Sequence, residues 1–334
     1  MTSLSHPPLT LLTSREYIQD LTLSVTRAKN RINIMSLILT SDSATRPLIK
    51  ALVGASKRGV KISVAVDSFT YSELGGFFSP LKHIKIKSRA TSAMVKQLRR
   101  AGIEFTWLGA SFKFNPFAGL THLKWSIVDN IAYGFGGTNL YKDGIESVDY
   151  MFKSHSPQLA DQITRQHQAI ITNDTPHTYP GYISKSEYGT IYIDSGQRHK
   201  SIIYDRLMKL TKQAVRIRVV TQYCPSGPLA RRLRQRKAEV YFNQARNTSF
   251  PTNMLIGYTE RYTGLRSLYK HEAYLHAKFM LFDLADGQKI AVTGSHNFAH
   301  SGVVFGTREV ALETSHPDIY TQLETFLSDH VIKN

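Results

Sequence analysis

The stretch THLKWSIVDN, residues 121–130, decides the fold and the chemistry expected of this chain. It places His122 and Lys124 two positions apart, and Asp129 five positions later, within an apolar run typical of a buried strand. Side chains two positions apart on a strand share a face, whereas those seven apart do not. His122 and Lys124 are therefore predicted to share an inward face, and Asp129 to point away from it or to lie in the following turn.

The same three residue types return at the same spacing in YLHAKFMLFD, residues 274–283, as His276, Lys278 and Asp283. A histidine and a lysine on an inward face are costly to bury without an anionic partner. An oxyanion such as a phosphoryl group would be a suitable partner.

Each triplet is followed by a loop of small residues that ends in asparagine, GGTN at 136–139 and GSHN at 294–297. Such loops let the backbone and a short amide side chain approach a ligand closely. The candidate substrate loops contain Gly136, Gly137, Gly294 and Ser295, and end at Asn139 and Asn297. A carboxylate follows each loop, Asp149 and Glu309, and could hold a histidine in one tautomer.

Helical and strand patterns alternate on both sides of the two triplets, which indicates an α/β fold in two similar halves. The endings SVDYMFKSHSPQLADQI and TREVALETSHPDIYTQLETFL repeat the order strand, break, amphipathic helix. The expected organisation is a first half at residues 1–172, a linker rich in turn formers at 173–198, and a second half at 199–334. Two such halves suggest a pseudo-twofold with a shared site at the seam.

Composition limits the class of partner. The chain has 334 residues, 42% of them hydrophobic, and a formal net charge of +17. That surplus favours a polyanion, either an anionic lipid surface or nucleic acid, without choosing between them. The single cysteine, Cys224, excludes an internal disulfide and is expected to be a buried structural thiol. No apolar run is long enough to span a membrane, and we expect a cytoplasmic protein.

Together the two sets would suit double displacement at phosphorus. Two lysines and two asparagines would clamp the phosphoryl oxygens. One imidazole would attack and form a phosphohistidine, while the other would protonate the departing oxygen and then deprotonate the incoming alcohol or water.

The segments HLKWSIVD…GGTN and HAKFMLFD…GSHN resemble the paired H-x-K-x4-D signatures of the phospholipase D superfamily, and the resemblance extends from about Ser14 to Val331. It implies two similar α-β-α sandwich halves with mixed central sheets, packed with pseudo-twofold symmetry. It also implies a phosphohistidine site that needs no metal or other cofactor, with His122 as nucleophile, His276 as acid and base, and structural roles for Asp129 and Asp283. Two departures are Gly137, where serine is usual, and a longer turn, LADGQK, in the second motif.

Within the superfamily, Gly-Gly-x-Asn followed by Gly-Ser-x-Asn is similar to bacterial cardiolipin synthases. The expected function is a phosphatidyltransferase on a phospholipid substrate, peripheral at the inner face of the membrane. The alternatives are a phospholipase D hydrolase, a nuclease or other nucleic-acid phosphodiesterase, and a family member that only binds. The oligomeric state stays open.

Three surface segments could serve these functions. Phe69–Ala90 interleaves aromatic and basic residues and is either an interfacial loop or an ordinary loop with a short edge strand. Ser111–Leu120 could line an apolar entrance or pack locally. The helix PLARRLRQRKA, residues 228–238, is either a solvated basic face or a phosphate- or lipid-binding patch. The histidines at 155, 167 and 316 are expected at the surface or as caps, whereas His296 lies in the GSHN loop.

Overall fold

The protein is described by a computed structural model for residues 9–70, 81–109, 120–174, 178–244 and 250–333. It contains two compact units. Unit 1 consists of Met1–Gly134, Thr138–Glu146 and Met151–Tyr179, and unit 2 of Phe135–Gly137, Ser147–Tyr150 and Pro180–Asn334. Two short segments from the first half of the sequence therefore belong to the second unit.

Unit 1 is built on a seven-stranded sheet with the order β1-β7-β6-β5-β2-β3-β4. The strands β2, β3 and β4 run parallel, and β5, β6 and β7 extend the sheet by antiparallel pairing. The strands are β1 (Thr10–Thr13), β2 (Arg31–Ser36), β3 (Lys61–Asp67), β4 (Glu104–Leu108), β5 (Trp125–Val128), β6 (Ile131–Gly134) and β7 (Tyr150–Ser154).

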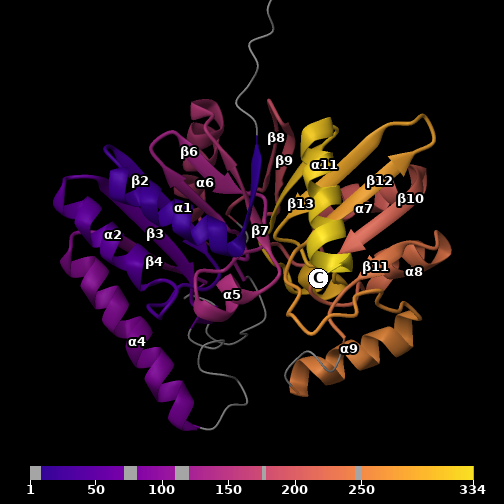
Figure 1. Cartoon of the computed structure of the whole chain (residues 1–334), viewed down its shortest axis with the longest axis horizontal. Helices are drawn as coiled ribbons and strands as arrows, with labels where there is room; N and C mark the ends of the chain where they lie inside the picture. Colours follow the sequence, from indigo (N-terminus) through magenta and orange to yellow (C-terminus); the bar gives the residue numbers. More distant parts are fainter. Residues whose placement is uncertain (1–8, 71–80, 110–119, 175–177, 245–249, 334) are drawn as a thin grey trace, which may run out of the picture. The chain divides into compact units, whose positions relative to one another are not determined.

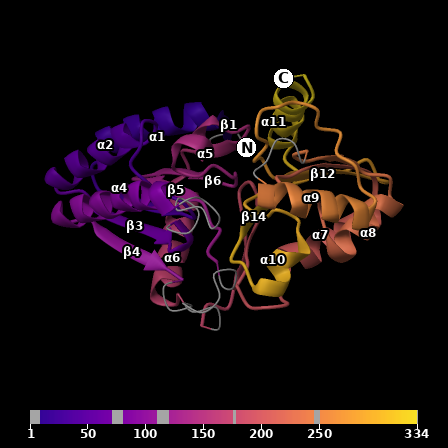
Figure 2. The ribbon, with the colours of Figure 1, turned by 90° about the horizontal axis from the view of Figure 1, so that it is seen from below.

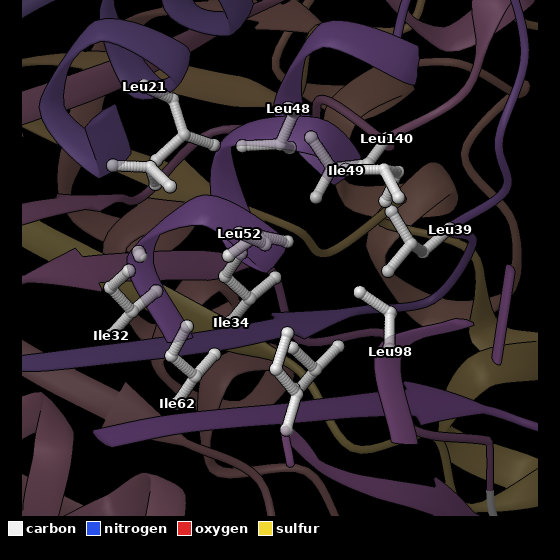
Figure 3. Close-up of a cluster of buried hydrophobic side chains, with 14 of the residues drawn as sticks. Leu21, Ile32, Ile34, Leu39, Leu48, Ile49, Leu52, Ile62, Leu98 and Leu140 are labelled. Carbon is white, nitrogen blue, oxygen red and sulfur yellow. The ribbon is translucent and has the colours of Figure 1, made fainter. Parts of the chain in front are cut away.

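Helices cover both faces of this sheet (Figures 1 and 2). They are α1 (Ser14–Arg27), α2 (Arg46–Lys57), α4 (Leu81–Arg100), α5 (Lys142–Glu146) and α6 (Pro157–Thr172). The apolar faces of α1, α2 and α4 pack on alternate residues of β2 and β3, and Leu21, Leu52 and Ile34 are fully buried there (Figure 3). Each such side chain stabilises the unit by about 2 kcal/mol. The opposite face receives α6, whose Thr164 accepts a hydrogen bond from Asn33.

Unit 2 repeats this plan with a seven-stranded sheet of order β11-β10-β12-β13-β14-β9-β8. Its strands are β8 (Tyr182–Ser186), β9 (Gly189–Ile193), β10 (Ala214–Val220), β11 (Glu239–Tyr241), β12 (Phe279–Leu284), β13 (Lys289–Gly294) and β14 (Val310–Thr314). Strands β10 and β11 are parallel and the other pairs antiparallel. The order β11-β10-β12-β13-β14 corresponds to β3-β2-β5-β6-β7, which confirms two similar α/β halves with mixed sheets.

The helices of unit 2 also lie on both faces of their sheet (Figure 1). They are α7 (Ile202–Gln213), α8 (Gly227–Gln235), α9 (Phe250–Thr263), α10 (His300–Phe305), α11 (Pro317–Phe326) and the π-helix η2 (Leu327–Ile332). Helices α7 and α8 bury Leu207 and Leu233 in one core. On the other face, Arg218 of β10 forms an ion pair with Glu324 of α11.

Three elements differ from the sequence prediction. The hairpin β8–β9 lies within the expected linker, where the chain passes from unit 1 to unit 2 after Tyr179. Helix α9 lies in the long polar stretch before the second motif, for which the sequence predicts no element. Helix α4 begins at Leu81, so residues 81–90 are helical rather than a loop or an edge strand, because this segment contains no glycine or proline to interrupt a helix. Residues 71–80 and 110–119 lie outside the described parts. None of the described helices is long and apolar enough to cross a membrane.

Candidate active site

The first motif lies immediately before β5 of unit 1. His122 and Lys124 precede the strand rather than belonging to it, and both are buried. The ammonium group of Lys124 donates a hydrogen bond of 2.9 Å to the backbone carbonyl of His122. This contact fixes the lysine head beside the backbone of its own motif histidine.

The second motif has the same local geometry in unit 2, immediately before β12. Lys278 donates from its ammonium group to the backbone carbonyl of His276, and both side chains are buried. The two motifs therefore fold alike, although their flanking sequences differ.

A carboxylate from the first half of the sequence holds the second histidine. Asp149 Oδ2 lies 2.6 Å from His276 Nδ1, and both residues belong to unit 2. Backbone hydrogen bonds fix this approach, since Val148 donates to Tyr274 at 2.8 Å and accepts from His276 at 3.0 Å. The sequence predicts a carboxylate that orients a histidine, but not which histidine it reaches.

The charge state of Asp149 determines what His276 can do. Burial opposes ionisation, but the hydrogen bond with His276 and the charges of His276 and Lys278 hold the pKa of Asp149 below its usual range. An ionised carboxylate can only accept, so Nδ1 of His276 carries the proton in this bond. Nε2 is therefore the ring nitrogen of His276 that could act as an acid or a base, and the carboxylate stabilises the protonated ring.

Gly137 stands where serine is usual, and the structure shows why. A Cβ at position 137 would lie 2.6 Å and 2.9 Å from the carboxylate oxygens of Asp149 and 3.0 Å from the carbonyl oxygen of His276. The carboxylate of Asp149 thus occupies the space that a side chain would need. Gly136 and Gly137 are both buried, and the Gly137 N–H donates to the carbonyl of Tyr150 at 3.3 Å.

The second loop has a serine, Ser295, at the position of Gly137, and its hydroxyl group contacts a carboxylate. Ser295 donates from its hydroxyl group to Glu309 Oε2 and accepts from the backbone of Val310 at 3.1 Å. Gly294 ends β13 directly before it. The two repeats therefore reach a similar arrangement by different pairs, glycine with aspartate in one and serine with glutamate in the other.

The motif asparagines carry an unusual pair of unsatisfied atoms. The side-chain oxygens of Asn139 and Asn297 are buried and accept no hydrogen bond from the described residues. Buried amide groups nearly always have a partner, and an unpaired one calls for a missing ligand or water. The two atoms lie at equivalent positions of the two repeats.

The motif aspartates hold the fold. Asp129 has a φ of 53° and accepts three backbone hydrogen bonds, from Lys29, Asn30 and Arg31, at 2.8–3.0 Å. Burial opposes its charge, yet these donors keep the pKa of Asp129 below its usual range. Asp283 accepts from the hydroxyl group of Tyr320 and pairs with Arg218, which ties β12 to α11 and β10.

Two buried residues that sequence reasoning missed hold the segment before each histidine. Asp67 accepts from the N–H of Thr121 at 2.6 Å, and Asn243 accepts from the N–H of Leu275 at 2.8 Å. Asp67 is the last residue of β3, and Asn243 lies two residues after the end of β11, the equivalent strand of unit 2. Both residues are fully buried. Each follows a short apolar run, VAV or VYF. A polar residue at that place could have marked these positions in the sequence, because functional groups often lie at the carboxyl ends of parallel strands.

His167, His296 and Cys224 have contacts within their own unit. His167 is buried rather than at the surface, since it accepts from the indole of Trp125 at 3.2 Å, and burial lowers its pKa to about 3. His296 accepts from the backbone of Phe298 at 2.8 Å. Cys224 is buried as expected, and burial raises its pKa to about 12. Among the described residues, no cluster of three or more His, Cys, Asp or Glu could hold a metal ion.

Comparison with known proteins identifies the family. Residues 22–171 and 182–330 each match the family described as "Cardiolipin synthase, PLD-like domain". The comparison with curated proteins gave no match. Phosphatidylserine synthase from Haemophilus influenzae Rd KW20 aligns with a TM-score of 0.67 and 13% identity, over 96% of this chain and 85% of its own.

Polyphosphate kinase from Porphyromonas gingivalis aligns with a TM-score of 0.62 and 12% identity, over 96% of this chain and 46% of its own. This chain thus spans less than half the length of that kinase, and at such identities both likenesses show the fold alone. The family match, in contrast, covers both halves of the sequence and both motifs. The chain therefore belongs to the phospholipase D superfamily and carries two copies of its domain.

Proposed function

We propose that the protein is a phosphatidyltransferase of cardiolipin-synthase type, which transfers a phosphatidyl group through a covalent phosphohistidine. The observation that carries the proposal is that both repeats contain the same set of site features. Each has a buried histidine whose carbonyl binds the motif lysine, and each ends in an asparagine whose buried amide oxygen accepts no hydrogen bond within the described parts of the chain. The family description names cardiolipin synthase and supports the choice of substrate.

In this mechanism both histidines act on the same phosphoryl group. A ring nitrogen of His122 attacks phosphorus and forms the P–N bond while the P–O bond to the leaving alcohol breaks. His276 gives that oxygen its proton from Nε2. His276 then takes a proton from the incoming alcohol, whose oxygen attacks phosphorus and releases His122.

The assignment of His276 as acid and base is supported by Asp149. An ionised, buried carboxylate 2.6 Å from Nδ1 favours the imidazolium form that must store the proton between the two steps. The lysines and asparagines would stabilise charge on the non-bridging phosphoryl oxygens, where such donors contribute most to rate. No step requires a metal ion.

Hydrolysis by the same intermediate, with water as acceptor, and cleavage of nucleic-acid phosphodiesters are the alternatives. The formal charge of +17 suits either a lipid or a nucleic acid. Transfer, hydrolysis and nucleic-acid cleavage give different products, so one experiment separates the three activities.

The test incubates the protein with phosphatidylglycerol vesicles and, separately, with single-stranded DNA, both with EDTA present. Formation of cardiolipin and glycerol, with DNA intact, is the expected result. If phosphatidic acid is the main lipid product, the protein is a hydrolase rather than a transferase. DNA cleavage with untouched lipid would overturn the lipid assignment. His276→Asn should abolish turnover, whereas His155→Asn, at an exposed position outside the motifs, should match the wild type.

A further inference from the structure

Helix α9 of unit 2 exposes a row of large apolar and aromatic side chains. Met254, Tyr258 and Tyr262 are 62%, 70% and 77% exposed. They are four residues apart and therefore lie on one face of the helix, while Ile256 and Thr263 are buried on the other side. The rings of Tyr258 and Tyr262 are parallel, with centroids 6.4 Å apart. In Figure 1 this helix lies at the margin of unit 2, below α8.

Exposed basic side chains lie on α9 and on the neighbouring helix α8. Arg261 on α9 and Arg266 just after it are exposed. Helix α8 adds its exposed Arg231 and Arg234, and the guanidinium group of Arg234 reaches the end of α9, where a Cβ on Gly264 would lie 2.9 Å from it. Arg234 of the basic helix α8 therefore lies next to the chain directly after the end of α9.

The acidic residues nearby do not neutralise this surface. Glu260, which is half-buried, is the single acidic residue in the sequences of α8 and α9, which together carry four arginines. Exposed aromatic and apolar side chains that are rimmed by arginines mark a site of interaction rather than a solvated face. Tyrosine and methionine bury their apolar parts at the level of lipid headgroups, while arginines bind the phosphates there.

We propose that α9 and the basic face of α8 dock the protein on an anionic phospholipid bilayer, with Met254, Tyr258 and Tyr262 inserted among the headgroups. The exposed apolar row follows one face of α9, which suits a plane of lipid better than a single nucleic-acid strand, because strands bind in basic grooves. Leu268, 47% exposed in the segment after α9, adds a further apolar contact. The proposal concerns how the bilayer is held and is independent of the proposed phosphatidyl transfer.

The first experiment measures binding to vesicles of phosphatidylcholine with and without phosphatidylglycerol, by co-sedimentation. Changing Met254, Tyr258 and Tyr262 together to serine should weaken binding to the anionic vesicles by about tenfold or more. A matched control changes Ile183 and Val215 to serine, which are 59% and 65% exposed elsewhere on unit 2 and should leave binding unchanged.

A second set of variants tests the charges. Arg231→Gln, Arg234→Gln and Arg261→Gln should each weaken binding by about fivefold at low salt, and the loss should shrink as salt rises. Tyr258→Trp provides a direct reporter, whose emission should shift to shorter wavelength on anionic vesicles. Thermal unfolding followed by circular dichroism identifies any variant that fails to fold.

Turnover of a short-chain phosphatidylglycerol, dissolved below its micelle concentration, separates docking from chemistry. The serine variant should keep this activity while it loses vesicle binding. Wild-type affinity of the folded serine variant for anionic vesicles would overturn the proposal. So would an unshifted emission from the Tyr258→Trp variant, or loss of single-stranded DNA binding with vesicle binding intact, which would assign the surface to nucleic acid.

Discussion

Gly137→Ala tests whether the space beside Asp149 is needed for catalysis. The backbone at Gly137 does not have the positive φ that favours glycine, so alanine causes no backbone strain there and only the missing space opposes it. The new methyl group would lie 2.6 Å from Asp149 Oδ2, the same atom that bonds His276 Nδ1. The substitution therefore acts on the orientation of His276 without touching the imidazole.

The size of the effect follows from these distances. Ordinary van der Waals contact begins near 3.4 Å, so Asp149 Oδ2 must retreat by about 0.8 Å or the loop must move. A retreat away from His276 would lengthen their 2.6 Å hydrogen bond to as much as about 3.4 Å and weaken it. A hydrogen bond to a charged group contributes about 1.5–3 kcal/mol, which corresponds to a fall in kcat of about 10- to 150-fold. Overpacking should also lower the free energy of unfolding by about 1–3 kcal/mol.

The assay measures kcat on phosphatidylglycerol together with the urea midpoint of unfolding. Gly54→Ala is the matched control, because a Cβ there has only Arg58 nearby, at 3.8 Å, and alanine favours the helix. Gly137→Ser should behave like Gly137→Ala, since it adds the same Cβ. A Gly137→Ala protein that is as active and as stable as the wild type would refute the reasoning.

Three further results are expected. Asp149→Ala should lower kcat by about 10³- to 10⁴-fold with little change in KM, because His276 loses the group that fixes its tautomer; an equal fall in kcat for a control such as Asp161→Ala would argue against this role. Asn243→Ala should lower both kcat and stability, the latter by about 1–3 kcal/mol, since the buried N–H of Leu275 loses its acceptor and the carbonyls of Gln222 and Leu275 lose their donor. Asn243→Asp keeps the acceptor but turns a carboxylate oxygen towards those carbonyls, so it should not restore the loss, and an Asn243→Ala protein with wild-type kcat and stability would contradict this role. Burial lowers the pKa of His167 from 6.5 to about 3, so its contribution to stability is complete above pH 6.5 and is lost as pH falls towards 3. Over that range the urea midpoint of His167→Asn should fall less steeply than that of the wild type. Parallel slopes would contradict the burial of a neutral ring.

The sequence predicts the elements next to the motifs well, because two signals agree there. Strands such as β5, β6, β12 and β13 combine strong apolar runs with turn residues at Asp129–Asn130 and Asp286–Gly287. The same repeat of residue types also leads to the family and the two mixed sheets. These features depend on local pattern, which a single sequence carries.

Other features depend on packing that local pattern does not carry. Helix α9 contains Pro251 and Gly257 and has a weak apolar periodicity, and the strands of the hairpin β8–β9 are short and only partly buried. His167 looks like a surface histidine until α6 is placed against Trp125 and Ser63. The hydrogen bond between Asp149 and His276 depends on a β-bridge between Val148 and Leu275, which are far apart in the sequence.

The covalent intermediate is the central claim, and trapping it is the most direct measurement. Phosphatidylglycerol labelled with ³²P in its phosphate is mixed with the enzyme and quenched in alkali, which preserves phosphohistidine, and the labelled peptide is identified by mass spectrometry. We expect label on His122, its absence from His122→Asn, and its accumulation in His276→Asn when the substrate has a good leaving group. Label that persists in His122→Asn would move the nucleophile to another residue, and active enzyme that never carries label would contradict double displacement altogether.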